Sequence, residues 1–224
     1  MYSKGVIPLK KKLIIILLIL VIIGITIYLI NYNKDPFKNY KTIKNYSDLV
    51  EINPNAKKLT TKTIDDEIKE RKYIEELSSS LILGYSLYSS PFTDEITVVK
   101  DMEELELLNL TYIFMTNNQE SVCIKEDYLK DMLHKYFRID KDDFSNDVKE
   151  YLYSKTKRSY CFDSLDFDNV KLELINYQRN KNSIELKYKE ENTYEEETYE
   201  WDIKFYYDKE GYYLYSFSNI IVPY

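Results

Sequence analysis

The longest uninterrupted run of apolar residues lies close to the N-terminus. Leu13–Ile30 is eighteen residues long and holds no charge and no strong helix breaker. At a rise of about 1.5 Å per residue, a helix of this length spans roughly 27 Å, close to the ~30 Å hydrocarbon core of a bilayer. A helix that is apolar on every side has no face for water, and it belongs in lipid or deep inside a protein. The run therefore predicts a transmembrane helix, and the Lys10–Lys12 triplet before it favours lipid.

The residues around this run distinguish an uncleaved anchor from a signal peptide. The apolar core of a signal peptide usually spans about 7–15 residues and ends at a small-residue cleavage site. Here the run is longer, Asn31–Lys34 follows it without such a pattern, and no cysteine stands where a lipoprotein would be processed. We expect a signal-anchor with residues 1–12 as a cytoplasmic tail. Lysines flank the run four against four, so we base the orientation on the adjacent triplet and the short tail, which place the C-terminal domain outside.

A polar segment with little periodicity follows the apolar run. Residues 31–59 contain Pro36 and Pro54, and only Tyr46–Val50 suggests a short helical turn. Polar composition, proline and the lack of a sustained period are typical of a linker. The sequence predicts a stalk here and a soluble domain over residues 60–224.

Apolar positions at helical spacing predict several helices in the first half of this domain. They are expected from Thr63 to before Pro91, from Asp101, from Ile124, and from about Ser145 to Tyr153. The Thr63 hydroxyl precedes acidic residues, which is the usual chemistry of a helix start. For Phe92–Val99 the sequence allows either a short strand or a connecting segment.

The period changes to two in the last third of the chain. Apolar residues alternate with charged ones in four sets: Leu172 and Leu174; Ile184, Leu186 and Tyr188; Tyr199, Trp201, Ile203 and Phe205; Tyr213, Tyr215 and Phe217. Arg179–Asn182 and Asp208–Gly211 supply turn residues between them. This alternation predicts an antiparallel β-meander of about four strands with one buried face. Helices followed by strands give an α+β domain, with the helices packed on the apolar face of the sheet.

One further pattern carries a resemblance. Asp101…Leu105…Leu108 is followed by Ile124-Lys125-Glu126-Asp127-Tyr128-Leu129…Tyr136-Phe137 and by a C-terminal meander, all behind one N-terminal anchor. This arrangement, over about residues 64–217, resembles uncharacterised single-pass membrane-anchored proteins of low-GC Gram-positive bacteria. The resemblance implies a tethered α+β domain and brings no activity with it. The order of elements is also similar to that of cystatin-like and nuclear-transport-factor-like folds, as a fold analogy.

Composition narrows the functional classes. The net charge is −7 and the pI is about 5.0, which argues against nucleic acid as a partner, because such proteins need a basic face. The chain has 24 tyrosines, and only four of its 31 basic residues are arginine. AT-rich codons of a low-GC bacterium explain most of this usage. The alternative is a tyrosine-rich surface that binds carbohydrate or protein.

The two cysteines, Cys123 and Cys161, both follow the anchor. If the domain lies outside the cell, a disulfide between them is chemically permitted. It would close a loop of 38 residues and stabilise the fold by about 3–4 kcal/mol in the loop-entropy model. The alternative is two buried thiols that do not meet.

The sequence gives little support for a catalytic motif or a metal-binding motif. His134 is the only histidine, and on one straight helix it would lie about 16 Å from Cys123, too far for a nucleophile and its base. Asp140–Phe144 and Asp163–Asp168 are acidic but lack the spacing of a calcium loop. Four glycines in the whole chain leave no phosphate-binding loop. We therefore assign no catalytic, metal-binding or cofactor-binding residue, and we favour a protein that is not an enzyme.

The expected function is a non-catalytic, membrane-tethered extracytoplasmic domain that binds an envelope protein or a cell-wall component. A first alternative is a cell-wall or polysaccharide hydrolase. It would need two carboxylates about 5–10 Å apart in a cleft lined by aromatics such as Trp201. A second alternative is a subunit of a membrane complex, which would expose an apolar patch larger than a few hundred Å².

Overall fold

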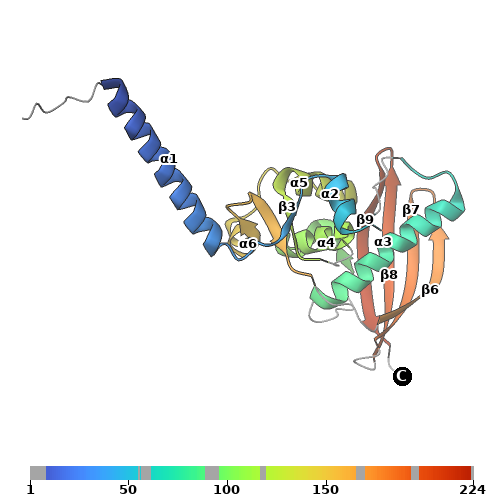
Figure 1. Ribbon diagram of the computed structural model, residues 1–224. Coiled ribbons are helices and arrows are strands. Elements are labelled where there is room, and N and C mark those ends of the chain that lie inside the picture. Colours follow the sequence, from blue (N-terminus) through green and yellow to red (C-terminus); the bar gives the residue numbers. More distant parts are fainter. Residues whose placement is uncertain are drawn as a thin grey trace, which may run out of the picture.

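The computed structural model describes residues 9–54, 56, 62–88, 96–116, 120–164, 170–192 and 197–222. Its first element is the long helix α1, Leu9–Lys34, which projects from the rest of the molecule (Figure 1). Within Leu13–Lys34, an 18-residue window has a mean hydropathy of 3.4, and none of that window is buried. The hydroxyl of Thr26 donates to the carbonyl of Ile22, at 2.9 Å, and needs no partner outside the helix. The chain thus has an N-terminal apolar helix long enough to cross a membrane, and a signal sequence would have the same properties.

The segment after α1 is part of the folded domain. Strand β1, Lys41–Ile43, pairs in parallel with strand β3, Val122–Lys125. Helix α2, Tyr46–Ile52, follows at once, and the side chain of Asn45 caps it by accepting from the first backbone amides. Four apolar side chains of this segment are buried: Ile43, Leu49, Ile52 and Ala56. The described part of residues 31–59 therefore does not form the free stalk that its polarity suggests, because these side chains anchor it to the core.

Four further α-helices and one short 3₁₀-helix follow in the described ranges. They are α3, Glu67–Tyr88; η1, Val99–Asp101; α4, Glu104–Thr116; α5, Glu126–Phe137; and α6, Asn146–Leu152. Each α-helix lies where the periodicity predicts one, although it begins one to four residues later. Ser145 accepts from the amide of Val148 and caps α6. Pro91, the expected barrier after α3, lies outside the described residues.

The late start of α5 has a tertiary cause. Ile124 was expected at the start of the helix, but Val122, Cys123 and Ile124 are buried side by side in β3. A short run of consecutive buried residues suits a strand covered on both faces. Strand β3 lies in a small sheet of order β1-β3-β5-β4, in which β5 is Ser159–Phe162 and β4 is Tyr153–Ser154. The sequence pattern did not predict this sheet.

The large sheet contains the predicted meander. Its strands are β2, Thr97–Val98; β6, Val170–Arg179; β7, Ser183–Asn192; β8, Glu197–Asp208; and β9, Gly211–Ile221. Their order is β2-β9-β8-β7-β6, and neighbouring strands are antiparallel. Strand β2 shows that the ambiguous stretch Phe92–Val99 contributes a short edge strand.

The inner face of the sheet agrees with the alternation in β7 and β8. Ile184, Leu186 and Tyr188 of β7 are buried, as are Tyr199, Trp201, Ile203 and Phe205 of β8. Helix α3 lies across this face (Figure 1), and the hydroxyl of Tyr188 donates to the carbonyl of Glu75 in α3. The domain is therefore α+β, with helices on the apolar face of an antiparallel sheet.

The prediction for β9 is wrong at two residues because the strand contains a bulge. Lys204 pairs with Ser216, but Phe205 pairs with Leu214, so Tyr215 is an extra residue in β9. An extra residue reverses the facing of the residues on one side of it. Tyr212 and Leu214 consequently point into the core, Tyr213 and Tyr215 point outward, and Phe217 returns to the core.

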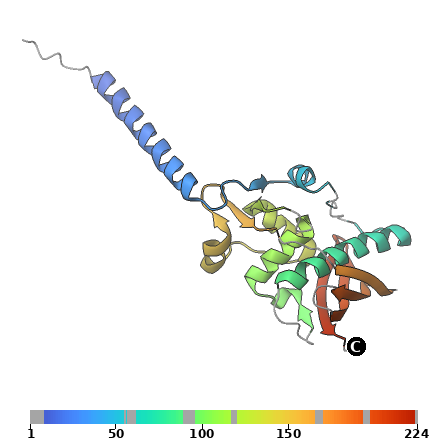
Figure 2. The ribbon, with the colours of Figure 1, turned by 60° about the horizontal axis from the view of Figure 1, so that its bottom comes forward.

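Two views show how the parts lie relative to one another. The C-terminal end of α1 meets the small sheet and α6, and the large sheet lies on the side of the domain away from α1 (Figures 1 and 2). The large sheet is thus the part of the domain that is farthest from the apolar helix.

Candidate binding surface

Cys123 and Cys161 lie directly opposite each other on β3 and β5. Their sulfur atoms are 2.12 Å apart, a bonding distance, and their Cα atoms are 3.9 Å apart. Both side chains are buried in the small sheet. Formation of the bond in the cell remains a prediction.

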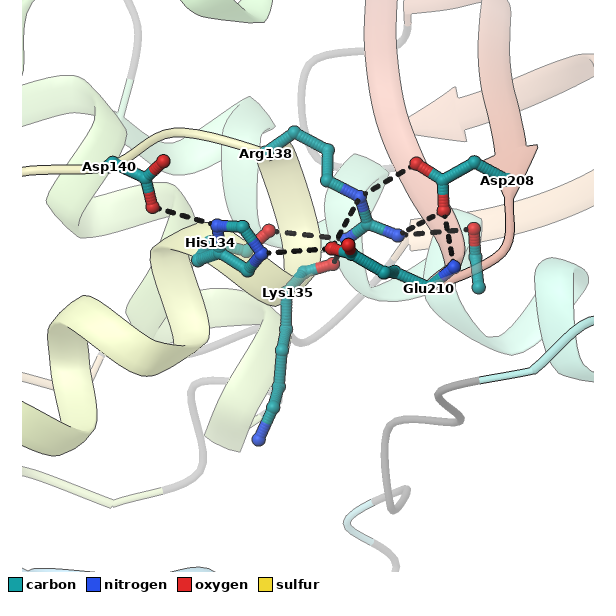
Figure 3. A network of polar contacts seen from close by, with 7 residues as sticks. His134, Lys135, Arg138, Asp140, Asp208 and Glu210 are labelled. Carbon is teal, nitrogen blue, oxygen red and sulfur yellow. Dashed lines mark hydrogen bonds and ion pairs between the residues drawn. The ribbon is translucent and has the colours of Figure 1, made fainter.

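His134 lies on the outer side of α5, between two carboxylates from different parts of the chain. Its Nδ1 is 2.8 Å from Oδ1 of Asp140, and its Nε2 is 3.1 Å from Oε2 of Glu210, in the turn between β8 and β9 (Figure 3). Hydrogen bonds to Glu210 and Asp140 raise the pKa of His134. The side chain is 40% exposed. This environment favours a charged histidine that links two elements.

Arg138 makes a second link beside the first. It ends α5 in a left-handed backbone conformation, with φ 57°. Its guanidinium donates to both carboxylate oxygens of Asp208, with Nε–Oδ2 at 3.1 Å and Nη2–Oδ1 at 2.9 Å. It also donates to the carbonyls of His134, Lys135 and Gly211 (Figure 3). The Arg138 guanidinium holds the pKa of Asp208 below its usual value. The C-terminus of α5 is thereby tied to the β8–β9 turn.

Three outward tyrosines lie next to this network. The Arg138 guanidinium carbon lies 4.9 Å from the ring centroid of Tyr213. The rings of Tyr213 and Tyr206 are 6.0 Å apart, and Tyr215 meets Tyr206 edge to face at 4.8 Å. Tyr206 and Tyr213 are half-buried, and Tyr215 is 36% exposed. We call Tyr206, Tyr213, Tyr215 and Arg138 the tyrosine face.

The chemistry of the tyrosine face suits recognition of another molecule. Tyrosine and arginine are enriched among the residues that dominate binding energy at protein interfaces. Tyrosine offers a large, stiff apolar ring with a polar tip, and mutual stacking fixes each ring before a partner arrives. Lys204 adjoins this face, because its ammonium lies 5.5 Å from the ring centroid of Tyr206 while it pairs with Glu185. Lys187 and Glu200 form a further cross-strand pair on the same side of the sheet.

The tyrosine face could not be found from the sequence. The count of 24 tyrosines does not indicate which of them are exposed or lie together. Strict alternation also places Tyr213 and Tyr215 on the core side of β9. Only the bulge brings them outward, next to Tyr206 of the neighbouring strand.

Two buried carboxylates stabilise the core rather than forming a cleft. Glu70 of α3 is fully buried and accepts from Tyr212 Oη at 2.6 Å, Tyr177 Oη at 3.2 Å and Arg179 Nε at 2.7 Å. Burial and the Glu70 carboxylate raise the pKa of both tyrosines. Glu190 is also fully buried and accepts from the indole nitrogen of Trp201 at 2.6 Å.

This placement bears on the hydrolase alternative. That alternative expects Trp201 to line an open cleft, but Trp201 has no exposed surface and donates to a buried carboxylate. Trp201 therefore cannot line a sugar-binding cleft in this structure, contrary to what the hydrolase alternative expects.

The acidic segments do not assemble a metal centre in the described ranges. Asp140 contacts His134, and Asp143 forms an ion pair with Lys149. Asp163 accepts from the hydroxyl of Tyr40, and residues 165–169 lie outside the described part. Over the described ranges, no three His, Cys, Asp or Glu side chains converge as metal ligands would.

Comparison with known proteins adds no relative. No protein-family model matches the chain, and no curated protein and no solved structure matches it either.

Proposed function

We propose that this chain is a membrane-tethered extracytoplasmic domain that binds an envelope protein through its tyrosine face and catalyses no reaction. The observation that carries the proposal is the outward cluster of Tyr206, Tyr213 and Tyr215 with Arg138 stacked on it. Stacked tyrosines beside an arginine are the residue types that anchor protein interfaces.

The position of the tyrosine face fits a tethered binder. It belongs to the large sheet, which lies on the side of the domain away from α1 (Figures 1 and 2). With α1 in the membrane as an uncleaved anchor, this sheet points away from the lipid and is accessible to a partner. The Lys10–Lys12 triplet directly before the helix and the short N-terminal tail favour the outside for the domain.

The two links from α5 support the same role. Arg138 and His134 tie the β8–β9 turn to a helix, so the strands that carry the tyrosines have little freedom near that turn. A surface that is rigid before binding loses less entropy when it binds.

Crosslinking in intact cells tests the proposal. A photo-crosslinking amino acid replaces Tyr215, and in a matched control it replaces Glu173, an exposed residue on the outer side of β6. We expect one or a few envelope proteins crosslinked at position 215 and absent at position 173, identified by mass spectrometry. Tyr206→Ala should weaken that capture by ten-fold or more, as expected for a residue at a binding hot spot (about 2 kcal/mol). Identical products at both positions, or wall glycan in place of protein, would contradict the proposal.

A further inference from the structure

A groove of about 760 Å³ lies where α1 meets the domain. One wall is the end of α1, with Tyr28, Asn31 and Lys34, and the other is the turn between β4 and β5 with the adjoining end of α6. Asp35 joins the two walls. Its carboxylate is buried and accepts from the hydroxyls of Ser154 and Thr156.

The contacts of Asp35 determine the protonation state of its carboxylate at the floor of the groove. Burial would raise the pKa of Asp35, but the two hydroxyls and the amide of Phe37, which donates at 2.9 Å, lower it below its ordinary value. Asp35 is therefore an ionised carboxylate whose oxygens are already occupied by donors, and it holds the β4–β5 turn against the end of α1.

The mouth of the groove carries three cations that have no ion-pair partner among the described residues. Four basic residues and two acidic residues, Asp35 and Glu150, line the groove. Lys149 is paired with Asp143. The side chains of Lys34, Lys155 and Arg158 are exposed, and no described residue forms an ion pair or hydrogen bond with them. On a chain of net charge −7, three cations that no described residue neutralises gather around one groove and form a local site for an anion.

The groove lies at a particular depth relative to the apolar helix. Tyr28 belongs to the apolar run that ends at Ile30, and Asn31 and Lys34 follow within about one turn. If α1 spans the membrane, as the proposed function requires, these residues stand at the boundary between hydrocarbon and headgroups. Tyrosine and lysine are the residue types that occur at that level.

We propose that this groove binds the phosphate of an anionic phospholipid headgroup, of the phosphatidylglycerol class, through Lys34, Lys155 and Arg158. Arginine and lysine are the usual protein ligands of phosphate, arginine through its planar fork and lysine as a point charge. A domain of net negative charge is repelled by an anionic leaflet, so a local cation cluster is what would allow the domain to rest against it. Bound lipid would hold the domain in one orientation on the membrane and leave the large sheet directed away from it.

Amide hydrogen exchange of the full chain in nanodiscs tests this inference. The chain is compared in phosphatidylcholine discs and in discs that also contain phosphatidylglycerol, and exchange is read over residues 154–158. We expect phosphatidylglycerol to slow exchange there. Each Lys or Arg near an anionic surface strengthens the attraction about five-fold, so the double variant Lys155→Gln/Arg158→Gln, which removes two, should bind the lipid roughly 25-fold more weakly. The matched control, Lys100→Gln/Lys181→Gln, removes two exposed lysines beside the large sheet and should behave as wild type.

Three results would overturn the inference. Exchange over residues 154–158 could be the same in both discs, or the double variant could respond to phosphatidylglycerol as wild type does. Inorganic phosphate added to phosphatidylcholine discs could give the same protection, which would make the groove a site for a soluble anion. The anchor is tested separately, because a chain that alkaline carbonate extracts from membranes refutes the tether, whereas an integrated chain with no lipid effect refutes only the groove.

Discussion

At the scale of single residues, the polar side chains that connect α5 to the β8–β9 turn show how much depends on distant partners. His134 and Arg138 are close in sequence on one helix, yet they bind Glu210 and Asp208, about 70 residues further along. Composition identifies His134 as the single histidine and excludes a histidine cluster. It does not indicate that the ring lies between two carboxylates, because that requires both α5 and the hairpin to be in place.

The linkage at His134 predicts a pH-dependent stability. Hydrogen bonds to Glu210 and Asp140 raise the pKa of His134 above its ordinary 6.5 in the folded chain. Folding therefore favours the charged form of His134. The contribution of this charged form to the stability of the folded chain is complete below about pH 6.5 and is lost as the pH rises through the pKa of His134 in the folded chain. We expect His134→Gln to lower the free energy of unfolding more at about pH 5.5 than at about pH 8.5. Urea unfolding of the full chain in a neutral detergent measures the difference. A gap between wild type and variant that does not change with pH would contradict this linkage.

At the scale of elements, the small sheet and the contact between α3 and α4 decide the packing. The small sheet joins three separate parts of the chain, since β1, β3 and β5 come from residues 41–43, 122–125 and 159–162. Each strand is too short to be predicted from its own alternation, and β3 is buried on both sides. Helices α3 and α4 approach closely at Gly84, where an added Cβ would meet side-chain atoms of Ile113 at 2.2–2.8 Å.

The disulfide prediction belongs to the small sheet. Cys123 and Cys161 face each other across β3 and β5, and we expect the bond in the chain isolated from cells. Alkylation of the unfolded, non-reduced chain should leave no labelled cysteine in its mass spectrum. Reduction should lower the free energy of unfolding by about 3–4 kcal/mol, because it releases a closed loop of 38 residues. Two labelled cysteines before reduction would show that the sulfurs stay apart.

The close contact at Gly84 gives a second prediction at this scale. Gly84→Ala adds a methyl group where Ile113 already lies, so we expect a loss of about 1–3 kcal/mol in the free energy of unfolding, despite the ~1 kcal/mol that alanine gains over glycine in a helix. Thermal and urea unfolding measure it. Gly24→Ala is the matched control, because an added Cβ at Gly24 meets nothing within 4 Å. An unchanged or higher stability of Gly84→Ala would show that α3 and α4 can separate at no cost.

At the scale of the whole molecule, the architecture separates two surfaces. The groove lies at the end of α1, and the tyrosine face lies on the sheet away from it (Figures 1 and 2). Because Ile43, Leu49, Ile52 and Ala56 pack into the domain, little free chain separates the apolar helix from the fold. The domain would therefore be held close to the membrane and could not swing on a long stalk.

The main prediction for the whole molecule is the orientation of the chain in the membrane. With the N-terminus inside, protease added to spheroplasts should digest the domain, whereas the same protease should spare a cytoplasmic control protein. Lysed spheroplasts provide the second control, since every chain is then accessible. A domain that survives in intact spheroplasts and is lost after lysis would place it inside the cell. That result would remove the envelope partner and the oxidising surroundings that favour the disulfide.

The features that the sequence determined by itself are those with a local cause. An apolar run of eighteen residues forms a helix wherever it lies, because the helix satisfies its own backbone and has no polar side. Period-two alternation in β7 and β8 places the same residues in the core whichever helix covers them. The α+β class follows from these periods, and the structure confirms it.

The tertiary structure decided whatever depends on distant partners or on register. One extra residue in β9 moves Tyr213 and Tyr215 from the core side to the surface, because side chains alternate strictly along a strand. Ile43 and Leu49 become core residues only after β1 pairs with β3. The groove forms where Asp35 binds the β4–β5 turn next to the end of α1, which brings two distant parts of the chain together. Both surfaces proposed here depend on such non-local contacts, which a pattern of neighbouring residues does not contain.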